Sequence, residues 1–430
     1  MHPRIFLGML LAVGVLTAAN LLFHGMHFGM DLYRGRWCED AYLFLPGPLF
    51  HAEDRFMDYF NMQRFMPVQG QTSALPPSLI LLYGVASLIT RATSPGVSIV
   101  IFSLFQFGLF AYSIARLMGN LPGAVSGWSM TIRIAFALAL CLLSYPVIIA
   151  IDRGNFALTV CSMIALGIAA HLRGERWQAA AWIGIAAALR ITPLVFAAMY
   201  LGKKDFRYLL TAVVVAMSAT GIAILPASLI FEGYSLQTWL DGFDGHSFMY
   251  TTWPNGLGWS SSLYNLVRFI RYLDGIPLDT ILESAYKAER LYSMVCAGLL
   301  GLLAWKLRRA DAITGFTLLS LAFVALPHVT GDYYLATLIA PLVMIAGQSR
   351  IDYPSLTLLI LLLVPKDYFY YYFHIHKFSD IKVHDFAEYV DLLITGYKPS
   401  SIQSLVINPV LLIWLGVRMY LKPPTDSAQT

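Results

Sequence analysis

The chain has 430 residues, of which 58% are hydrophobic and only 13% charged, and its mean hydropathy is +0.64. Soluble domains carry roughly 25% charged residues, so this composition excludes a soluble globular protein and indicates a membrane protein. The formal net charge of +4 is small and spread along the chain, which excludes the basic patch of a nucleic-acid-binding protein. The four cysteines show no CxxC spacing, so neither a disulfide framework nor a cysteine metal site is expected.

The first apolar segment, 5–24, follows a basic start and is longer than the core of a signal peptide. We interpret it as an uncleaved membrane span; the alternative is a signal peptide cleaved near Ala18. A spanning helix needs about 20 apolar residues. Further apolar segments lie at 76–92, 97–118, 132–151, 156–171, 177–201, 208–231, 291–307, 313–328, 333–347, 354–366 and 403–421.

Several of these segments are too short to cross a bilayer alone, and some contain proline. Backbone at membrane depth must form its hydrogen bonds internally, which leaves helices as the structure for segments this apolar. The predicted fold is therefore all-α: a polytopic transmembrane bundle of about 10–13 helices, including broken or re-entrant ones. We expect one domain over 1–421 and a disordered tail over 422–430.

Two kinds of polar segment separate the helices. Residues 25–75, 233–290 and 367–402 mix Tyr, Phe and Trp with Asp, His and Arg, which suits external loops with short helices at the membrane interface. The clusters 173–176, 203–207 and 306–309 are short and basic, so the positive-inside rule places them in the cytoplasm. Since only the segment 177–201 separates the first two clusters, we expect it to enter the membrane and turn back near Arg190 and Pro193.

The first external loop contains the most promising acidic residues. Asp54 and Asp58 are four residues apart, on one face if this stretch is helical. A carboxylate beside a cavity at the membrane surface is a natural general base. The alternative is a solvated helix with ordinary surface acids.

Two further polar positions interrupt apolar sequence. Arg190 follows an unbroken apolar run, and a charge at bilayer depth needs a partner or a wet cavity. Its planar fork suits phosphate, although a structural ion pair with Asp152 or snorkelling would also explain it. His328 and Asp332 lie in a second interruption, where an imidazole could bind phosphate or the segment could be a capped surface turn. The joint at 152–155 is interpreted as a tight turn.

A cluster of histidines near the C-terminal end, with His374, His376 and His384 beside Asp385, contains residue types that bind metals. Their spacing matches no zinc signature, so we expect no metal site. The nearby run of tyrosines, 368–372, is typical of an interfacial aromatic belt. The chain contains no P-loop, nucleophile elbow or dinucleotide fingerprint.

Several short motifs occur in a characteristic order. They are the Gly154-Asn155 turn, the basic turn 173–176, the alanine-rich run ending at Arg190 before Pro193-Leu194, an acidic loop at Asp58 running into Leu75-Pro-Pro77, and Pro327-His328 before Asp332-Tyr-Tyr334. Over residues 54–345 this series resembles the polyprenyl-phosphate-dependent, mannosyltransferase-type GT-C glycosyltransferases of glycosyltransferase family 87. Leu75 stands where the family usually has Tyr, and Leu326 where Ser is common.

The resemblance implies a sugar transfer, of mannose or a related hexose, from a polyprenyl-phosphate donor to a lipid or glycan acceptor at the periplasmic face of a bacterial inner membrane. It implies Asp58 as the base, with Asp54 as the fallback, and inversion at the anomeric carbon without metal or cofactor. Arg190 and His328 would bind the donor phosphate. The expected substrate-binding residues are Tyr59, Asn155, Trp253, Asn255, Asp332 and Tyr333.

Two other functions fit part of the sequence. A transporter or flippase of lipid-linked saccharides would share the buried arginine and broken helices, but it would not need acidic external loops. A structural partner in a polysaccharide-assembly complex would tolerate Asp58→Asn. Neither the sugar nor the acceptor can be read from the residues.

Overall fold

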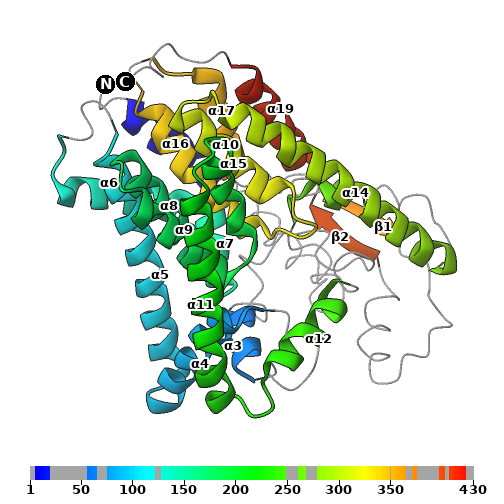
Figure 1. The fold of residues 1–430 in the computed structure, drawn as a ribbon. Coiled ribbons are helices and arrows are strands. Elements are labelled where there is room, and N and C mark those ends of the chain that lie inside the picture. Colours follow the sequence, from blue (N-terminus) through cyan, green and yellow to red (C-terminus); the bar gives the residue numbers. More distant parts are fainter. Residues whose placement is uncertain are drawn as a thin grey trace, which may run out of the picture.

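A computed structural model describes residues 5–19, 56–64, 75–121, 127–247, 260–267, 278–348, 350–364, 370–374, 397–401 and 406–422. Within these residues the chain forms a bundle of apolar helices, shown in Figure 1. The predicted helical transmembrane fold is confirmed. All but the first residue of the predicted tail lies outside the described residues, and the prediction of a single domain stays a prediction.

Nearly every predicted apolar segment is a helix at the expected place. After a first helix, Ile5–Ala19, the elements that match predicted segments are α4 (Pro77–Ala92), α5 (Pro95–Met118), α6 (Met130–Leu143), α7 (Tyr145–Asp152), α8 (Ala157–Leu172), α9 (Arg176–Leu189), η2 (Thr192–Ala197), α10 (Ala198–Gly202), α11 (Phe206–Ile230), α14 (Leu278–Leu307), α15 (Ala312–Ala325), η5 (Asp332–Leu338), α16 (Ile339–Ala346), α17 (Tyr353–Leu363) and α19 (Asn408–Leu421). Many begin at residues that suit a helix start. Ser94, Ser129 and Asp311, for example, each accept a backbone N–H three residues ahead.

The segments predicted as external loops contain secondary structure of their own. The short helices α3 (Met57–Arg64) and α12 (Leu236–Ser247) fit the predicted interfacial helices. In contrast, the last loop contributes the antiparallel strands β1 (Tyr370–His374) and β2 (Tyr397–Ser401), with Tyr372 paired to Pro399. The run of tyrosines is therefore partly a strand. The prediction also placed the start of α14 too late, because the helix begins at Leu278 inside the predicted loop.

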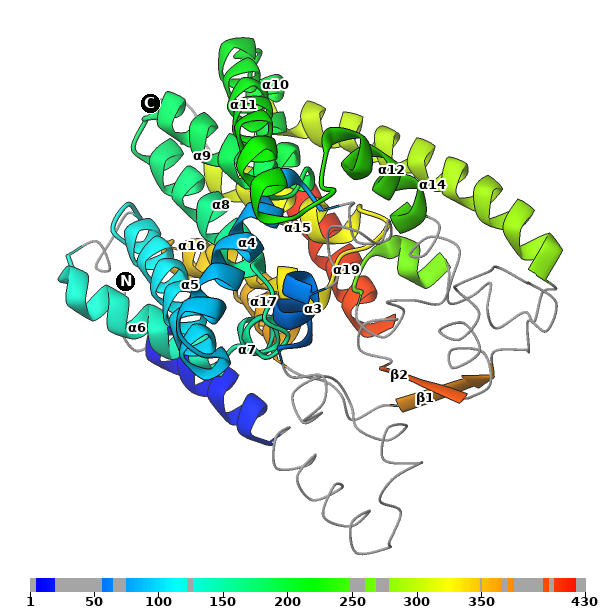
Figure 2. The ribbon, with the colours of Figure 1, turned by 90° about the horizontal axis from the view of Figure 1, so that it is seen from below.

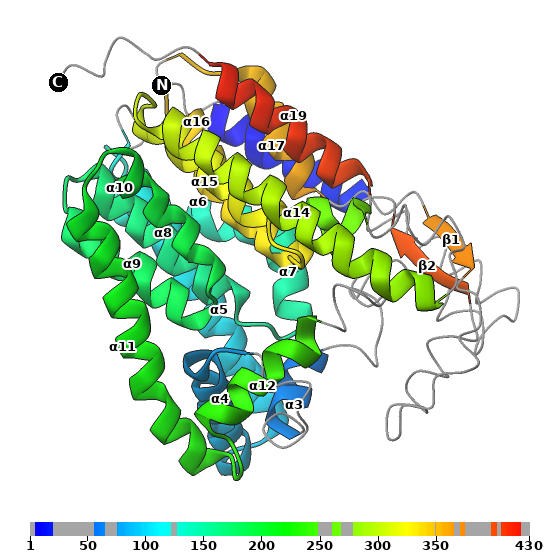
Figure 3. The ribbon, with the colours of Figure 1, turned by 45° about the vertical axis from the view of Figure 1, so that its right-hand side comes forward.

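Some helices are long and apolar enough to cross a membrane. These are α5, α11 and, from Lys287 onward, α14; the pair α6 and α7, bent by 74° at Ser144, would add a fourth span. Much of the surface of α11 and α14 is exposed and apolar, as expected for helices that face lipid. Figure 3 shows α11 and α14 leaving the region of α10 in different directions.

The segment 177–201 enters the bundle and turns back, as expected. The helix α9 ends at Leu189, Arg190 is extended with φ −160°, and η2 and α10 return the chain. The two basic turns consequently lie together, with Arg176 Nη1 2.9 Å from the Asp205 carboxylate. At 1.5 Å per residue, α9 reaches only about 20 Å into the bundle.

A second hairpin has the same form. The helix α15 ends at Ala325, the loop 326–331 follows, and η5 and α16 return beside α15. The two hairpins meet at their tips, where Arg190 Nη2 donates to the backbone carbonyl of Val329 at 2.8 Å. Tyr292 of α14 supports the second tip, because its hydroxyl donates to the carbonyls of Ala325 and Leu326.

Close packing of α9 against α11 depends on Gly184. A Cβ at Gly184 would lie 2.6 Å from the backbone oxygen of Ala212 and 2.8 Å from Val215 Cβ, whereas a Cβ at Gly221 of α11 would meet nothing within 4 Å. We expect Gly184→Ala to force the helices apart and to lower the free energy of unfolding by about 1–3 kcal/mol. Thermal unfolding of the purified protein in detergent measures this.

The control for this substitution is Gly221→Ala, which changes a glycine to alanine in a helix without a close neighbour. It should leave the melting temperature unchanged or raise it slightly, because alanine favours helix. Equal melting temperatures for the two variants would contradict the assigned packing.

Candidate active site

The short helix α3 is attached to the joint between α7 and α8 by its backbone. The amide of Phe56 donates to the carbonyl of Asp152 at 2.6 Å, and the amide of Asp58 donates to the carbonyl of Arg153 at 3.0 Å. Figure 2 shows α3 close to α7. The joint that the sequence suggested to be a simple turn therefore fixes the position of Asp58.

Gly154 makes this contact possible. Its φ is +70°, a left-handed conformation that favours glycine, and a Cβ there would lie 2.4 Å from Tyr59 Cβ. Both the backbone conformation and the approach of α3 therefore require glycine at this position.

The Asp58 carboxylate is bonded on both oxygens. Arg153 Nη2 lies 3.4 Å from Oδ1, and Asn155 Nδ2 donates to Oδ2 at 3.0 Å. The Oδ1 of Asn155 accepts the amide of Ala157 at 2.9 Å, which fixes the orientation of the Asn155 side chain. The Asp58 side chain keeps 17% of its surface exposed. A carboxylate has about four acceptor positions, so Asp58 can still accept a proton from a ligand.

Tyr59, expected to contact substrate, lies in the core instead. Its side chain is 1% exposed, its hydroxyl hydrogen-bonds the Ser98 hydroxyl, and its ring packs against Phe102. Because successive helical residues point in different directions, placing Asp58 at an open position directs Tyr59 inward. This geometry assigns Tyr59 to packing.

Arg190 lies at the tip of the first hairpin, partly buried. Besides Val329, it contacts Thr192 through Nε at 3.2 Å, and its guanidinium carbon stands 4.1 Å from the centroid of the Tyr334 ring. The guanidinium is therefore oriented by the oxygens of Thr192 and Val329 and by the face of the Tyr334 ring. Two of its five N–H donors are used by Thr192 and Val329, which leaves donors for a ligand.

His328 lies at the tip of the second hairpin between two tyrosine rings, Tyr264 at 4.8 Å and Tyr292 at 5.3 Å. Its Nε2 is buried and makes no hydrogen bond within the described part of the chain. The imidazole also hydrogen-bonds the backbone of Glu289. Its Nε2 is therefore available to a ligand.

Asp332 holds the second tip together. It is 2% exposed and accepts a hydrogen bond from Ser261, whose Oγ accepts from Asn408 of α19. Nearby, Thr330 donates its amide to Ser260 Oγ at 3.1 Å. The expected contact between Asp332 and substrate does not agree with this buried position. The role of the Ser260–Ser262 segment depends on its pairing with a loop some 70 residues away, which no local sequence pattern shows.

The two hairpin tips and Asp58 belong to one region. The helix α7 packs against η5, and the charge of Asp58 interacts electrostatically with Tyr334, whose ring contacts Arg190. Tyr333 is partly exposed, so it remains a candidate for contact with substrate.

Some predicted residues lie outside the described part of the chain: Asp54, Trp253, Asn255, His376, His384 and Asp385. Among the residues that are described, no group of three or more His, Cys, Asp or Glu side chains is arranged to hold a metal ion.

The family model of glycosyltransferase family 87 matches residues 75–330 of the chain. This range includes the joint at 152–155, both basic turns, Arg190 and His328, while Asp58 lies before it. Neither the curated proteins nor the solved structures contain a match to the chain.

We expect Gly154→Ala to destabilise the protein by more than the cost of its backbone conformation, about 1–2 kcal/mol, because the new Cβ would displace Tyr59 and α3. Gly174→Ala is the matched control, since Gly174 has φ +81° but no neighbour within 4 Å. Thermal unfolding of both variants separates the two effects. If Gly154→Ala lowered the melting temperature no more than Gly174→Ala does, this would argue against the close contact between Gly154 and α3.

Proposed function

The chain belongs to glycosyltransferase family 87 and is an integral membrane protein, and from this premise we propose that it transfers a hexose from a polyprenyl-phosphate donor to a lipid or glycan acceptor. Mannose is the first candidate for the sugar. Transfer takes place at the outer, periplasmic face of a bacterial inner membrane. Membership in a glycosyltransferase family favours this reaction over transport of a lipid-linked saccharide.

The observation that carries the proposal is the position of Asp58. Its carboxylate is partly exposed and is held on one oxygen by Arg153 and on the other by Asn155. It also lies within electrostatic range of Tyr334, whose ring contacts Arg190. A positioned base and a positioned cation in one region are what a displacement at a phosphate-bearing carbon needs.

In the proposed reaction, Asp58 takes the proton from an acceptor hydroxyl. The hydroxyl oxygen then attacks the anomeric carbon from the side opposite to the phosphate. The bond between this carbon and the phosphate oxygen breaks, its electron pair leaves with the polyprenyl phosphate, and the configuration is inverted. Because phosphate is a good leaving group, the step requires no metal.

Arg190 binds the donor phosphate in this proposal. Its remaining N–H donors match the bidentate geometry that arginine uses with phosphate, and the charge that develops on the leaving group strengthens the contact. His328 adds a hydrogen bond through its buried Nε2. Arg153 and Asn155 act on Asp58 and position it, whereas Tyr333 contacts the sugar.

The orientation follows from the two basic turns. The positive-inside rule assigns these turns to the cytoplasm, and α9 leads from them to Arg190 over about 20 Å. Asp58 and the hairpin tips then lie toward the opposite leaflet. This placement supports a donor that is used from the outer half of the bilayer.

The first test is sugar transfer by the purified protein in lipid nanodiscs, with radiolabelled polyprenyl-phosphate mannose as donor and a membrane extract as the acceptor pool. We expect Asp58→Asn to reduce transfer by at least about 10²-fold, since the asparagine amide cannot take the hydroxyl proton. The folding of the variant is checked by its melting temperature.

Asp241→Asn provides the matched control. Asp241 is an exposed carboxylate of α12 that accepts a hydrogen bond from Gln237, and its replacement should leave transfer unchanged. No turnover by the wild type across several lipid-linked sugars, or full turnover by Asp58→Asn, would refute the proposed reaction.

A second test addresses the phosphate contact. Arg190→Lys keeps the charge but loses the planar fork, and we expect kcat to fall by about 10²–10³-fold. Arg207→Lys is the control, because Arg207 also lies over a tyrosine ring, that of Tyr208, but at the basic turn. Equal kcat values for the two variants would remove Arg190 from the proposed mechanism.

A further inference from the structure

One end of the molecule is strongly basic. The turns after α8, α10 and α14 lie there together with the C-terminal end of α19: Arg176 pairs with Asp205, Gly202 packs against Leu307, and Lys306 Nζ donates to the backbone carbonyl of Lys422 at 2.7 Å. We refer to this region as the basic end. In Figure 1 the C-terminal end of α19 lies toward the top, far from α3.

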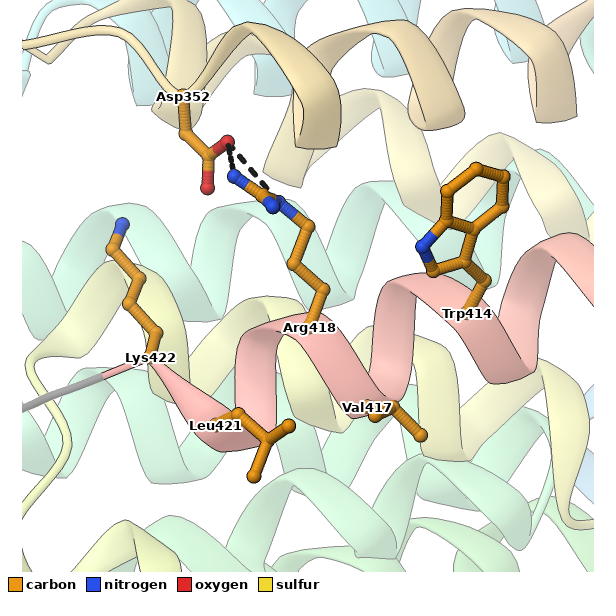
Figure 4. A pocket seen from close by; sticks show the side chains of 6 residues that line it. All are labelled: Asp352, Trp414, Val417, Arg418, Leu421 and Lys422. Atoms are coloured by element: carbon orange, nitrogen blue, oxygen red, sulfur yellow. Dashed lines mark hydrogen bonds and ion pairs between the residues drawn. The ribbon is translucent and has the colours of Figure 1, made fainter.

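A cavity of about 430 Å³ opens at the basic end, between α19 and the start of α17. It is lined by Asp352, Trp414, Val417, Arg418, Leu421 and Lys422. Figure 4 shows the basic side chains of α19 on the same side as Asp352, with Trp414 further along the helix. The cavity is therefore polar on one side and apolar on the other.

The single acidic residue lining the cavity is already neutralised. Arg418 Nη2 lies 2.7 Å from Asp352 Oδ1, and Ser355 donates its hydroxyl to the other carboxylate oxygen at 2.9 Å. Burial would raise the pKa of Asp352, but the hydrogen bonds from Arg418 and Ser355 outweigh it and hold the pKa below its usual range. Lys422 then leaves the cavity with a net positive charge, to which the neighbouring Lys306 adds.

The apolar side of the cavity faces outward. Trp414 is 62% exposed and Leu421 72%, and with Val417 between them they form one face of α19. In a membrane such a face contacts acyl chains, and tryptophan favours the depth of the headgroups. Lysine beside exposed apolar surface fits a molecule with an anionic head and a hydrocarbon chain better than it fits a free anion.

We propose that this cavity binds an anionic phospholipid of the leaflet at the basic end. The phosphate contacts the Lys422 ammonium and the outer edge of Arg418, and one acyl chain lies along Trp414, Val417 and Leu421. A zwitterionic phospholipid would bind more weakly, because the cation of its headgroup is repelled by the positive charge of the cavity. The lipid would join α17 to α19 at the boundary of the membrane, far from the site of sugar transfer.

Quenching of Trp414 fluorescence tests the proposal. The protein is placed in nanodiscs that contain phosphatidylcholine and a minor fraction of lipid brominated on its acyl chains, either phosphatidylglycerol or phosphatidylcholine. The Trp414 signal is the difference between the wild type and Trp414→Phe. We expect brominated phosphatidylglycerol to bind about five-fold more strongly, the effect of one basic side chain near a charged lipid surface.

The preference should disappear in Lys422→Gln and persist in Lys204→Gln, which removes an exposed lysine from another turn of the basic end. Added inorganic phosphate should leave the quenching unchanged. Equal quenching by the two lipids, a preference retained in Lys422→Gln, or displacement by inorganic phosphate would overturn the proposal. Since Lys422 lies at the opposite end of the bundle, failure here leaves the proposed reaction untouched.

Discussion

The structure depends on hydrogen bonds to the backbone at the tips of two hairpins, which end inside the bundle at Arg190 and at residues 326–331. A broken helix exposes carbonyl and amide groups, and within a membrane these groups must find partners in the protein. The guanidinium of Arg190 donates a hydrogen bond to the carbonyl of Val329, and the hydroxyl of Tyr292 donates to two carbonyls at the end of α15. The side-chain oxygen of Ser260 accepts a hydrogen bond from the amide of Thr330. The second tip is thus completed by residues from elsewhere in the chain.

This requirement also concentrates the polar chemistry. The groups that complete the second tip are a guanidinium and hydroxyls in an otherwise apolar bundle, and our proposal puts the donor phosphate in this region. Asp58 reaches the same region through a third break, the joint between α7 and α8. A bundle of unbroken spans would have no comparable collection of polar side chains at this depth.

Much of this arrangement could be predicted from the sequence, and the rest could not for a physical reason. Hydropathy located the helices because a bilayer imposes a length on apolar segments, and the two basic turns on one side revealed the turn-back at Arg190. Asp58 stands out in the sequence as an acid in a predicted external loop. The roles of Gly154 and Ser260 depend on contacts with residues far away in the chain, and no local pattern encodes them. An aromatic residue such as Tyr59 suits a core as well as a sugar-binding surface, and only its packing against Phe102 of α5 distinguishes the two.

The length of α14 couples the protein to the thickness of its membrane. With 30 residues it measures about 45 Å, but the part that is apolar enough to span, Lys287–Leu307, has 21 residues and matches a hydrocarbon region about 30 Å thick. Within this span, Tyr292 holds the end of α15 and packs against His328. A thicker or thinner membrane would therefore displace the second hairpin tip through α14. Lipids with longer or shorter chains would shift the imidazole of His328 relative to Arg190.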